Sequence, residues 1–196
     1  MTRFELIVIG CSWGGLEALG AILGALPRRF PLPIAVAQHR GPDSSDATLI
    51  SMLGRRSGPS VRAVEDKDPI AAGGGVYLAP PDYHLLVERG SFALSIDERV
   101  ASIRPSVDVL FESATDAYGS AVIGVVVTGA NADGAAGLAR LRRHGGHGIV
   151  QDPDGAVRSA MPAAAIAAGG ADEILPLAEI GPALIALAHT ADREQE

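Results

Sequence analysis

The chain has 196 residues, and its 16 Lys plus Arg against 23 Asp plus Glu give a net charge of −7. This charge argues against a nucleic-acid partner, because phosphate binding needs a basic face. A content of 47% hydrophobic and 20% charged residues excludes a disordered chain. The single cysteine, Cys11, excludes a disulfide framework, and no apolar run reaches the roughly 18 residues that span a bilayer. We therefore expect a cytoplasmic protein without membrane insertion.

Short β-rich runs alternate with helical runs, a pattern typical of an α/β domain with a mostly parallel sheet. In the first half, strands are predicted at residues 6–9, 33–38, 61–64 and 76–79, and helices from the first loop to about residue 26 and over 45–56. Residues 83–88 and 91–96 flank Arg89-Gly90 and predict an antiparallel hairpin inserted in the domain.

In the second half, a helix is predicted from Pro105 to about residue 118, because proline suits a first helical position. Residues 122–128 are predicted to be the longest apolar strand, and their composition indicates burial on both faces. Further elements are predicted as a helix to about 143, a strand at 148–151, a helix at 161–168, a strand at 173–175 and a helix at 180–189. We expect one doubly wound catalytic domain over residues 1–189, with helices on both faces, and a frayed polar tail at 190–196.

The loop after the first strand has two functional interpretations. A dinucleotide-binding fingerprint is incomplete, because Ser12 replaces its middle glycine and no acidic residue ends the second strand. A nucleotide-binding domain is therefore the weaker interpretation. The same residues spell Gly10-x-Ser12-x-Gly14, a nucleophile elbow that projects a serine hydroxyl from a strand-to-helix turn. The spelling alone does not distinguish this role from capping of the next helix by Ser12.

Strand topology supplies a base for Ser12. His39 follows the second predicted strand and so falls on the same edge of a parallel sheet as Ser12, where open α/β sheets bind ligands. Asp133, in the glycine-rich loop after the strand at 122–128, is the candidate carboxylate that orients the imidazole. Its alternative role is helix capping, and Asp43 and Asp46 are competing carboxylates.

Several segments of the chain resemble the catalytic domain of the CheB-type chemotaxis receptor methylesterases (protein-glutamate methylesterase and protein-glutamine glutaminase). They are residues 9–15 (Ile-Gly-Cys-Ser-Trp-Gly-Gly), 38–39 (Gln-His), 104–111 (Arg-Pro-Ser-Val-Asp-Val-Leu-Phe) and 128–137 (Thr-Gly-Ala-Asn-Ala-Asp-Gly-Ala-Ala-Gly), together with 76–80 and His84, and 151–152 with 161–162. Order and spacing hold over about residues 5–185. The resemblance implies a doubly wound α/β domain with an antiparallel hairpin and a Ser-His-Asp triad at Ser12, His39 and Asp133.

The resemblance also implies the activity. It points to a serine hydrolase that removes methyl esters from glutamate side chains of methyl-accepting chemoreceptors through an acyl-enzyme, with glutamine deamidation by the same chemistry. We expect no cofactor and no metal ion, and an oxyanion site at the backbone N–H groups of Trp13 and Ala130. Both positions depart from the family pattern: threonine usually follows the nucleophile, and the loop usually reads Gly-Met-Gly where this chain has Gly129-Ala130-Asn131.

Two further expectations follow from these departures and from the start of the sequence. Because the large Trp13 side chain could block the nucleophile, the alternative function is a catalytically inactive module that binds a signalling partner. Many family members carry an N-terminal receiver domain, whereas this sequence opens on the first catalytic strand. We therefore expect activity without phosphorylation, regulated by a separate protein or by expression.

Overall fold

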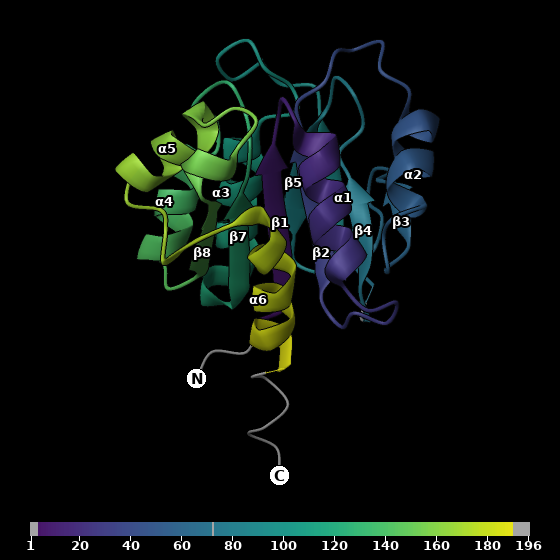
Figure 1. Cartoon of the computed structure of the whole chain (residues 1–196). Helices are drawn as coiled ribbons and strands as arrows, with labels where there is room; N and C mark the ends of the chain where they lie inside the picture. Colours follow the sequence, from purple (N-terminus) through teal and green to yellow (C-terminus); the bar gives the residue numbers. More distant parts are fainter. Residues whose placement is uncertain (1–3, 72, 190–196) are drawn as a thin grey trace.

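A computed structural model gives the fold and describes residues 4–71 and 73–189. Seven parallel strands form one sheet in the order β3-β4-β2-β1-β7-β8-β9, and two more form an antiparallel hairpin (Figure 1). The strands are β1 Leu6–Cys11, β2 Pro33–Gln38, β3 Val61–Ala63, β4 Gly75–Leu78, β5 His84–Glu88, β6 Ser91–Ser95, β7 Val122–Val126, β8 His147–Gln151 and β9 Glu173–Leu175. The helices are α1 Gly15–Ala25, α2 Asp46–Gly54, α3 Val107–Tyr118, α4 Ala135–Arg143, α5 Ala160–Ala167 and α6 Leu177–His189, with single 3-10 turns at Gly119–Ala121 and Pro153–Gly155.

The predicted doubly wound topology is confirmed. From β1 the chain adds β2 beside it, places β3 at the edge of the sheet and then inserts β4 between β3 and β2. It later returns to the other side of β1 with β7, β8 and β9. The direction of winding therefore reverses beside β1, and this reversal opens a crevice beyond the carboxyl ends of neighbouring strands. Because β1 pairs in parallel with both β2 and β7, the loops that follow these three strands meet at the upper edge in Figure 1.

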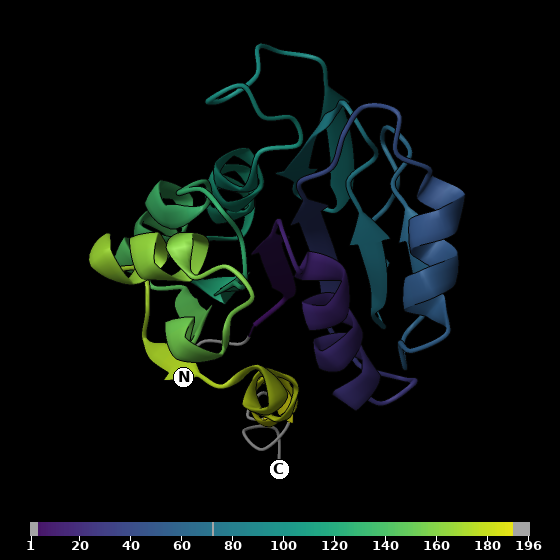
Figure 2. The same ribbon diagram turned by 45° about the horizontal axis from the view of Figure 1, so that its top comes forward.

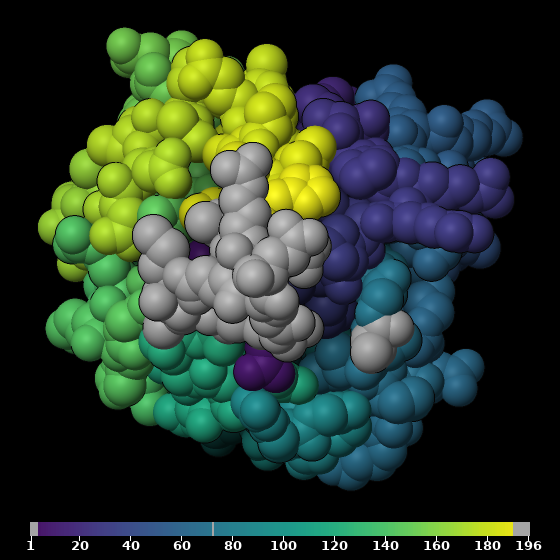
Figure 3. Space-filling view, turned by 90° about the horizontal axis from the view of Figure 1, so that it is seen from below, coloured from purple at the N-terminus to yellow at the C-terminus, as the bar shows by residue number. Residues whose placement is uncertain are grey.

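Two apolar cores cover the two faces of the sheet. Ile7 and Ile9 of β1 face one core, and the alternating Leu6 and Val8 face the other, as the period of two in a strand requires. Helices α1, α2 and α6 cover the first face, and α3, α4 and α5 cover the second; Figure 2 shows the two groups on either side of the sheet. Seen from the opposite edge in Figure 3, the last helix (yellow) lies beside the first (purple), and α1 packs against α6.

The start of α3 differs from the prediction. We expected Pro105 at the first helical position, but the helix begins at Val107 with Ser106 as its N-cap. The Ser106 hydroxyl accepts the backbone N–H of Val109 at 3.4 Å, so this serine rather than the proline marks the helix start. The predicted hairpin is confirmed, and β5 packs on α3.

The remaining element ends agree with the prediction to within a few residues. Strand β1 continues to Cys11, and α6 begins at Leu177, three residues before its predicted start. The tail expected at 190–196 lies outside the described residues. Among the helices that the structure describes, none is both long and apolar enough to cross a membrane.

Candidate active site

Ser12 lies in a sharp turn between β1 and α1. Gly14 has a left-handed backbone (φ +82°), and a Cβ at this position would lie 2.8 Å from the Cβ of Val157. Only glycine fits this turn, for both reasons. The N-cap of α1 is Gly14, and no side chain caps the helix, so the capping interpretation of Ser12 is wrong.

The neighbouring thiol does not compete as a nucleophile. Cys11 is fully buried, and burial raises the pKa of its thiol above the ordinary value. A protonated, inaccessible thiol is a weak nucleophile. Ser12, in contrast, lines an open cavity.

His39 and Asp133 are joined directly. The imidazole Nε2 lies 2.6 Å from Oδ2 of Asp133, and the two side chains are only 9% and 3% exposed. An ionised carboxylate can only accept hydrogen bonds, so Nε2 carries the proton and the lone pair of the neutral ring is on Nδ1. The carboxyl ends of β2 and β7 bring together these residues, which are 94 positions apart.

The Asp133 carboxylate is seated on the N-terminus of α3. It accepts the backbone N–H groups of Val107 at 2.6 Å and Asp108 at 3.0 Å, and the hydroxyl of Ser106 at 2.8 Å. Burial alone would raise the pKa of Asp133, but the hydrogen bonds from His39 and from α3 outweigh burial and lower it. Asp133 is therefore an anion at neutral pH, and it contacts α3 rather than capping α4, whose N-cap is Gly134.

The competing carboxylates lie elsewhere. Asp46 pairs with the guanidinium of Arg40, which also donates to the carbonyl of Ala79 at 2.6 Å. Asp43 is exposed in the loop before α2. Among the described contacts of His39, Asp133 is the only carboxylate.

Three residues near the site were not predicted from the sequence. Asn131 places its side-chain Nδ2 3.2 Å from Nδ1 of His39. Ser106 holds Asp133, and the buried His84 accepts the backbone N–H of Ser106 on its Nδ1 at 3.2 Å. All three fall in or beside segments that resemble the family, but a linear sequence does not say which side chains turn toward Asp133 or His39.

A cavity of about 390 Å³ opens above these residues. Ser12, His39 and Asn131 line it, together with Arg40, Arg99 and Arg104. Arg99 and Arg104 both pair with Asp82, at 2.7 and 2.9 Å. No hydrogen bond joins Ser12 to His39 among the described residues, although both face this cavity.

Backbone N–H groups beside Ser12 differ in whether they are already bonded. The N–H of Ser12 donates to the carbonyl of Thr128 and that of Gly129 to the carbonyl of Arg158, each at 3.0 Å. For the N–H groups of Trp13 and Ala130, the described part of the chain offers no acceptor.

The Trp13 side chain is 64% exposed, stacks under Arg158 and is not part of the cavity lining, so it does not block Ser12.

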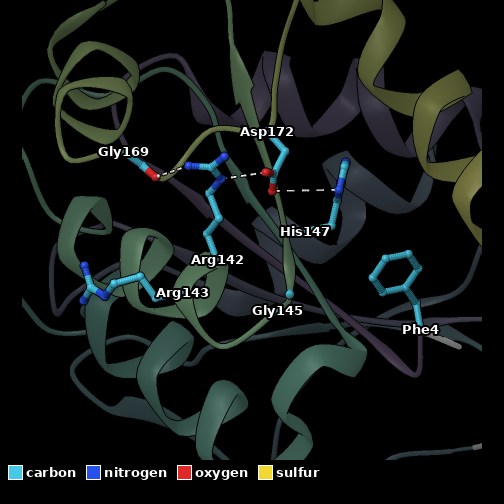
Figure 4. Close-up of a pocket in the computed structure, with 8 residues that line it drawn as sticks. Phe4, Arg142, Arg143, Gly145, His147, Gly169 and Asp172 are labelled. Carbon is cyan, nitrogen blue, oxygen red and sulfur yellow. Dashed lines mark hydrogen bonds and ion pairs between the residues drawn. The ribbon is translucent and has the colours of Figure 1, made fainter. Parts of the chain in front are cut away.

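A second cavity, of about 470 Å³, lies at the opposite edge of the sheet (Figure 4). Two of its basic side chains pair with Asp172: Arg142 contacts this carboxylate at 2.6 Å, and His147 contacts it at 3.9 Å. Within the described ranges, no group of three or more His, Cys, Asp or Glu side chains could hold a metal ion. The cavity with Ser12 and His39 is therefore the stronger candidate for chemistry.

Asp108 gives a prediction about stability. Burial is the main cause that raises its pKa to about 6, the charge of Asp133 adds to it, and the backbone N–H of Gly137, at 2.7 Å, opposes it. A carboxyl whose pKa is raised on folding stabilises the fold when protonated, and this stability is lost as pH rises from about 4 to above 6. Between pH 4 and 8 the wild type should therefore lose about 2 kcal/mol more stability than Asp108→Asn.

Urea unfolding of both proteins at several pH values measures this difference. The Asn side chain keeps an oxygen for the Gly137 N–H, so the comparison isolates the ionisation. Parallel stability curves for the two proteins would show that Asp108 ionises as an ordinary surface carboxyl.

Comparisons with known proteins place the chain in a family. The profile of the CheB methylesterase family matches residues 7–184. A protein of Leptospira interrogans, with the provisional name protein-glutamate methylesterase/protein-glutamine glutaminase, is 44% identical over 94% of this chain and 95% of its own length. The protein-glutamate methylesterase FrzG of Myxococcus xanthus is 39% identical over 93% of this chain, which spans 54% of FrzG.

The fold agrees as well. The crystal structure of the Thermotoga maritima CheB methylesterase catalytic domain superposes with a TM-score of 0.88 at 35% identity, covering 95% of this chain and 100% of that domain. The likeness thus extends from the sheet and its hairpin to the sequence of almost the whole chain. The chain belongs to the CheB methylesterase family, a family of carboxylic ester hydrolases.

Proposed function

We propose that this protein hydrolyses the methyl esters of glutamate side chains in methyl-accepting chemoreceptors, with Ser12 as nucleophile, His39 as general base and Asp133 as the carboxylate that orients it. The observation that carries the proposal is the His39–Asp133 contact of 2.6 Å, in a cavity that Ser12 also lines. Membership in a methylesterase family and the names of the relatives support the substrate class.

The contacts of His39 support a path for the protons. Ser12 Oγ attacks the γ-carbonyl carbon of the ester while its proton passes to Nδ1 of His39, the nitrogen that does not face Asp133. The carboxylate stabilises the imidazolium that forms and keeps Nε2 protonated throughout. Collapse of the tetrahedral intermediate expels methanol, which takes the Nδ1 proton. Water then repeats the sequence on the acyl-enzyme and releases the glutamate carboxylate.

The negative charge of the intermediate needs donors that are not already bonded. The N–H groups of Trp13 and Ala130 meet this requirement within the described residues, whereas those of Ser12 and Gly129 donate to carbonyls. We propose that Trp13 and Ala130 form the oxyanion site, where one donor typically contributes a factor of about 10² to 10³ in rate. The same chemistry on a glutamine side chain would release ammonia.

The alternative, an inactive interaction module, has less support. This alternative rested on the possibility that the Trp13 side chain blocks access to Ser12. That side chain is exposed and lies outside the cavity lining. The acidic net charge also gives no reason to expect a nucleic acid as partner. We propose the cytoplasm as the place of action, because the receptor segment that carries methyl-glutamate is expected there, and a separate protein as the regulator.

Release of methanol from chemoreceptor membranes methylated with a radioactive methyl group tests the proposal. We expect release with the purified chain, and labelling of Ser12 by a fluorophosphonate, which reacts with activated serines. Absence of both reactions would contradict the proposed function and favour the interaction module.

A further inference from the structure

Asn131 closes a ring of hydrogen bonds around the proposed base. Its Oδ1 accepts the backbone N–H of Asp133 at 3.1 Å, and its Nδ2 lies 3.2 Å from Nδ1 of His39. The third contact of the ring is the one between His39 Nε2 and Asp133. A backbone N–H can only donate, so the oxygen of the amide must face Asp133 and the NH₂ group must face His39.

The ring leaves no free lone pair on His39. A neutral imidazole has one hydrogen-bond donor and one acceptor nitrogen. Nε2 donates to Asp133, so the acceptor is Nδ1, and the N–H of Asn131 occupies it. Nδ1 is also the atom that must receive the proton of Ser12. Asn131 and Ser12 therefore compete for the same lone pair, and in this structure Asn131 holds it.

We propose that Asn131 is a positioning residue that caps the general base, and that its amide must leave Nδ1 before Ser12 can be activated. This inference rests on the proposed roles of Ser12 and His39. It also gives a physical meaning to a departure from the family pattern, which usually has glycine where this chain has Asn131. Glycine has no side chain with which to cap the imidazole.

The size of the effect follows from the contact that must be exchanged. A net hydrogen bond between neutral groups corresponds to a factor of about five in an equilibrium constant. Asn131→Gly and Asn131→Ala should therefore raise the rate of Ser12 acylation about five-fold. The rise should appear in kcat/KM for a small activated ester such as p-nitrophenyl acetate, and in the rate of fluorophosphonate labelling.

Asn131→Asp is the matched control. It has nearly the same shape and can still accept the Asp133 N–H, but it presents an acceptor to Nδ1 in place of a donor. Two carboxylates would then favour a doubly protonated imidazole, which cannot accept a proton, so acylation should slow. A merely structural role of Asn131 would instead lower the rate in all three variants, together with their stability.

Nitrogen-15 NMR of the histidines provides a readout that does not depend on turnover. In the wild type we expect the His39 Nδ1 signal of a lone pair that accepts a hydrogen bond, and in Asn131→Ala a shift toward that of a free imine nitrogen. A free Nδ1 in the wild type would overturn the proposal even if no variant folds.

The remaining outcomes are also decisive. An unchanged acylation rate in Asn131→Gly and Asn131→Ala, with Ser12 still labelled, would contradict the proposal that Asn131 caps the general base. A slower rate in both, with stability unchanged, would overturn it as well and would instead indicate that the amide donates to the oxyanion. Failure of Ser12 to react in the wild type would contradict the proposed function, whereas the NMR measurement would still decide whether Asn131 bonds to His39.

Discussion

Ser12→Ala is expected to lower methanol release by a factor of roughly 10⁶, as removal of the nucleophilic serine does in a known Ser-His-Asp hydrolase. The substitution removes the hydroxyl that we propose forms the acyl-enzyme. The fold should not change, because the Ser12 side chain caps no helix and the backbone N–H bond to Thr128 remains. The free energy of unfolding should therefore stay within about 0.5 kcal/mol of the wild type.

The measurement combines methanol release, fluorophosphonate labelling and urea unfolding. Ser102→Ala provides the control, since Ser102 lines the same cavity but lies outside the β1–α1 turn. It should leave labelling intact, whereas Ser12→Ala should abolish it. Substantial methanol release by Ser12→Ala would remove this residue from the role of nucleophile.

The topology and the approximate place of the site were predictable because both follow from the strands. The apolar runs of β1, β2 and β7 are distinct in the sequence, and parallel strands end at one edge. Residues that directly follow such strands, as Ser12 and His39 do, are thus brought to the same crevice whatever their separation along the chain.

The atoms that hold the site were not predictable, because they depend on side-chain directions in loops. The turn after β7 could have directed Asp133 onto α4, the helix that follows it, but the structure seats it on α3. Likewise, a sequence does not specify which imidazole nitrogen of His39 faces the carboxylate, or that Asn131 reaches the other one. The helix start at Pro105 was wrong for a similar reason: a capping serine follows it directly.

Asp133→Asn should lower turnover by a factor on the order of 10⁴, if this triad responds as the serine-protease triad does. With its NH₂ group facing His39, the amide would donate to Nε2 and move the imidazole proton to Nδ1. The ring would then present a proton to Ser12 where it must accept one. Nitrogen-15 NMR of His39 can observe this change of tautomer directly, and methanol release measures its consequence.

The same substitution should also cost stability, although Asn is in general as good a helix cap as Asp. The carboxylate uses both oxygens to accept four donors: His39, Val107, Ser106 and Asp108. An amide has one oxygen, so either orientation leaves a buried N–H of α3 without an acceptor, at a cost of about 1–3 kcal/mol.

The pH dependence separates this loss from a general defect. The pKa of Asp133 is lowered in the folded protein, so its ionisation stabilises the fold above the ordinary aspartate pKa of about 3.9, and this contribution disappears as pH falls through the lower folded value. The stability difference between wild type and Asp133→Asn should be constant above about pH 5 and should shrink below pH 4. Near wild-type turnover, combined with this loss of stability, would mean that Asp133 only holds α3 and that another group orients His39.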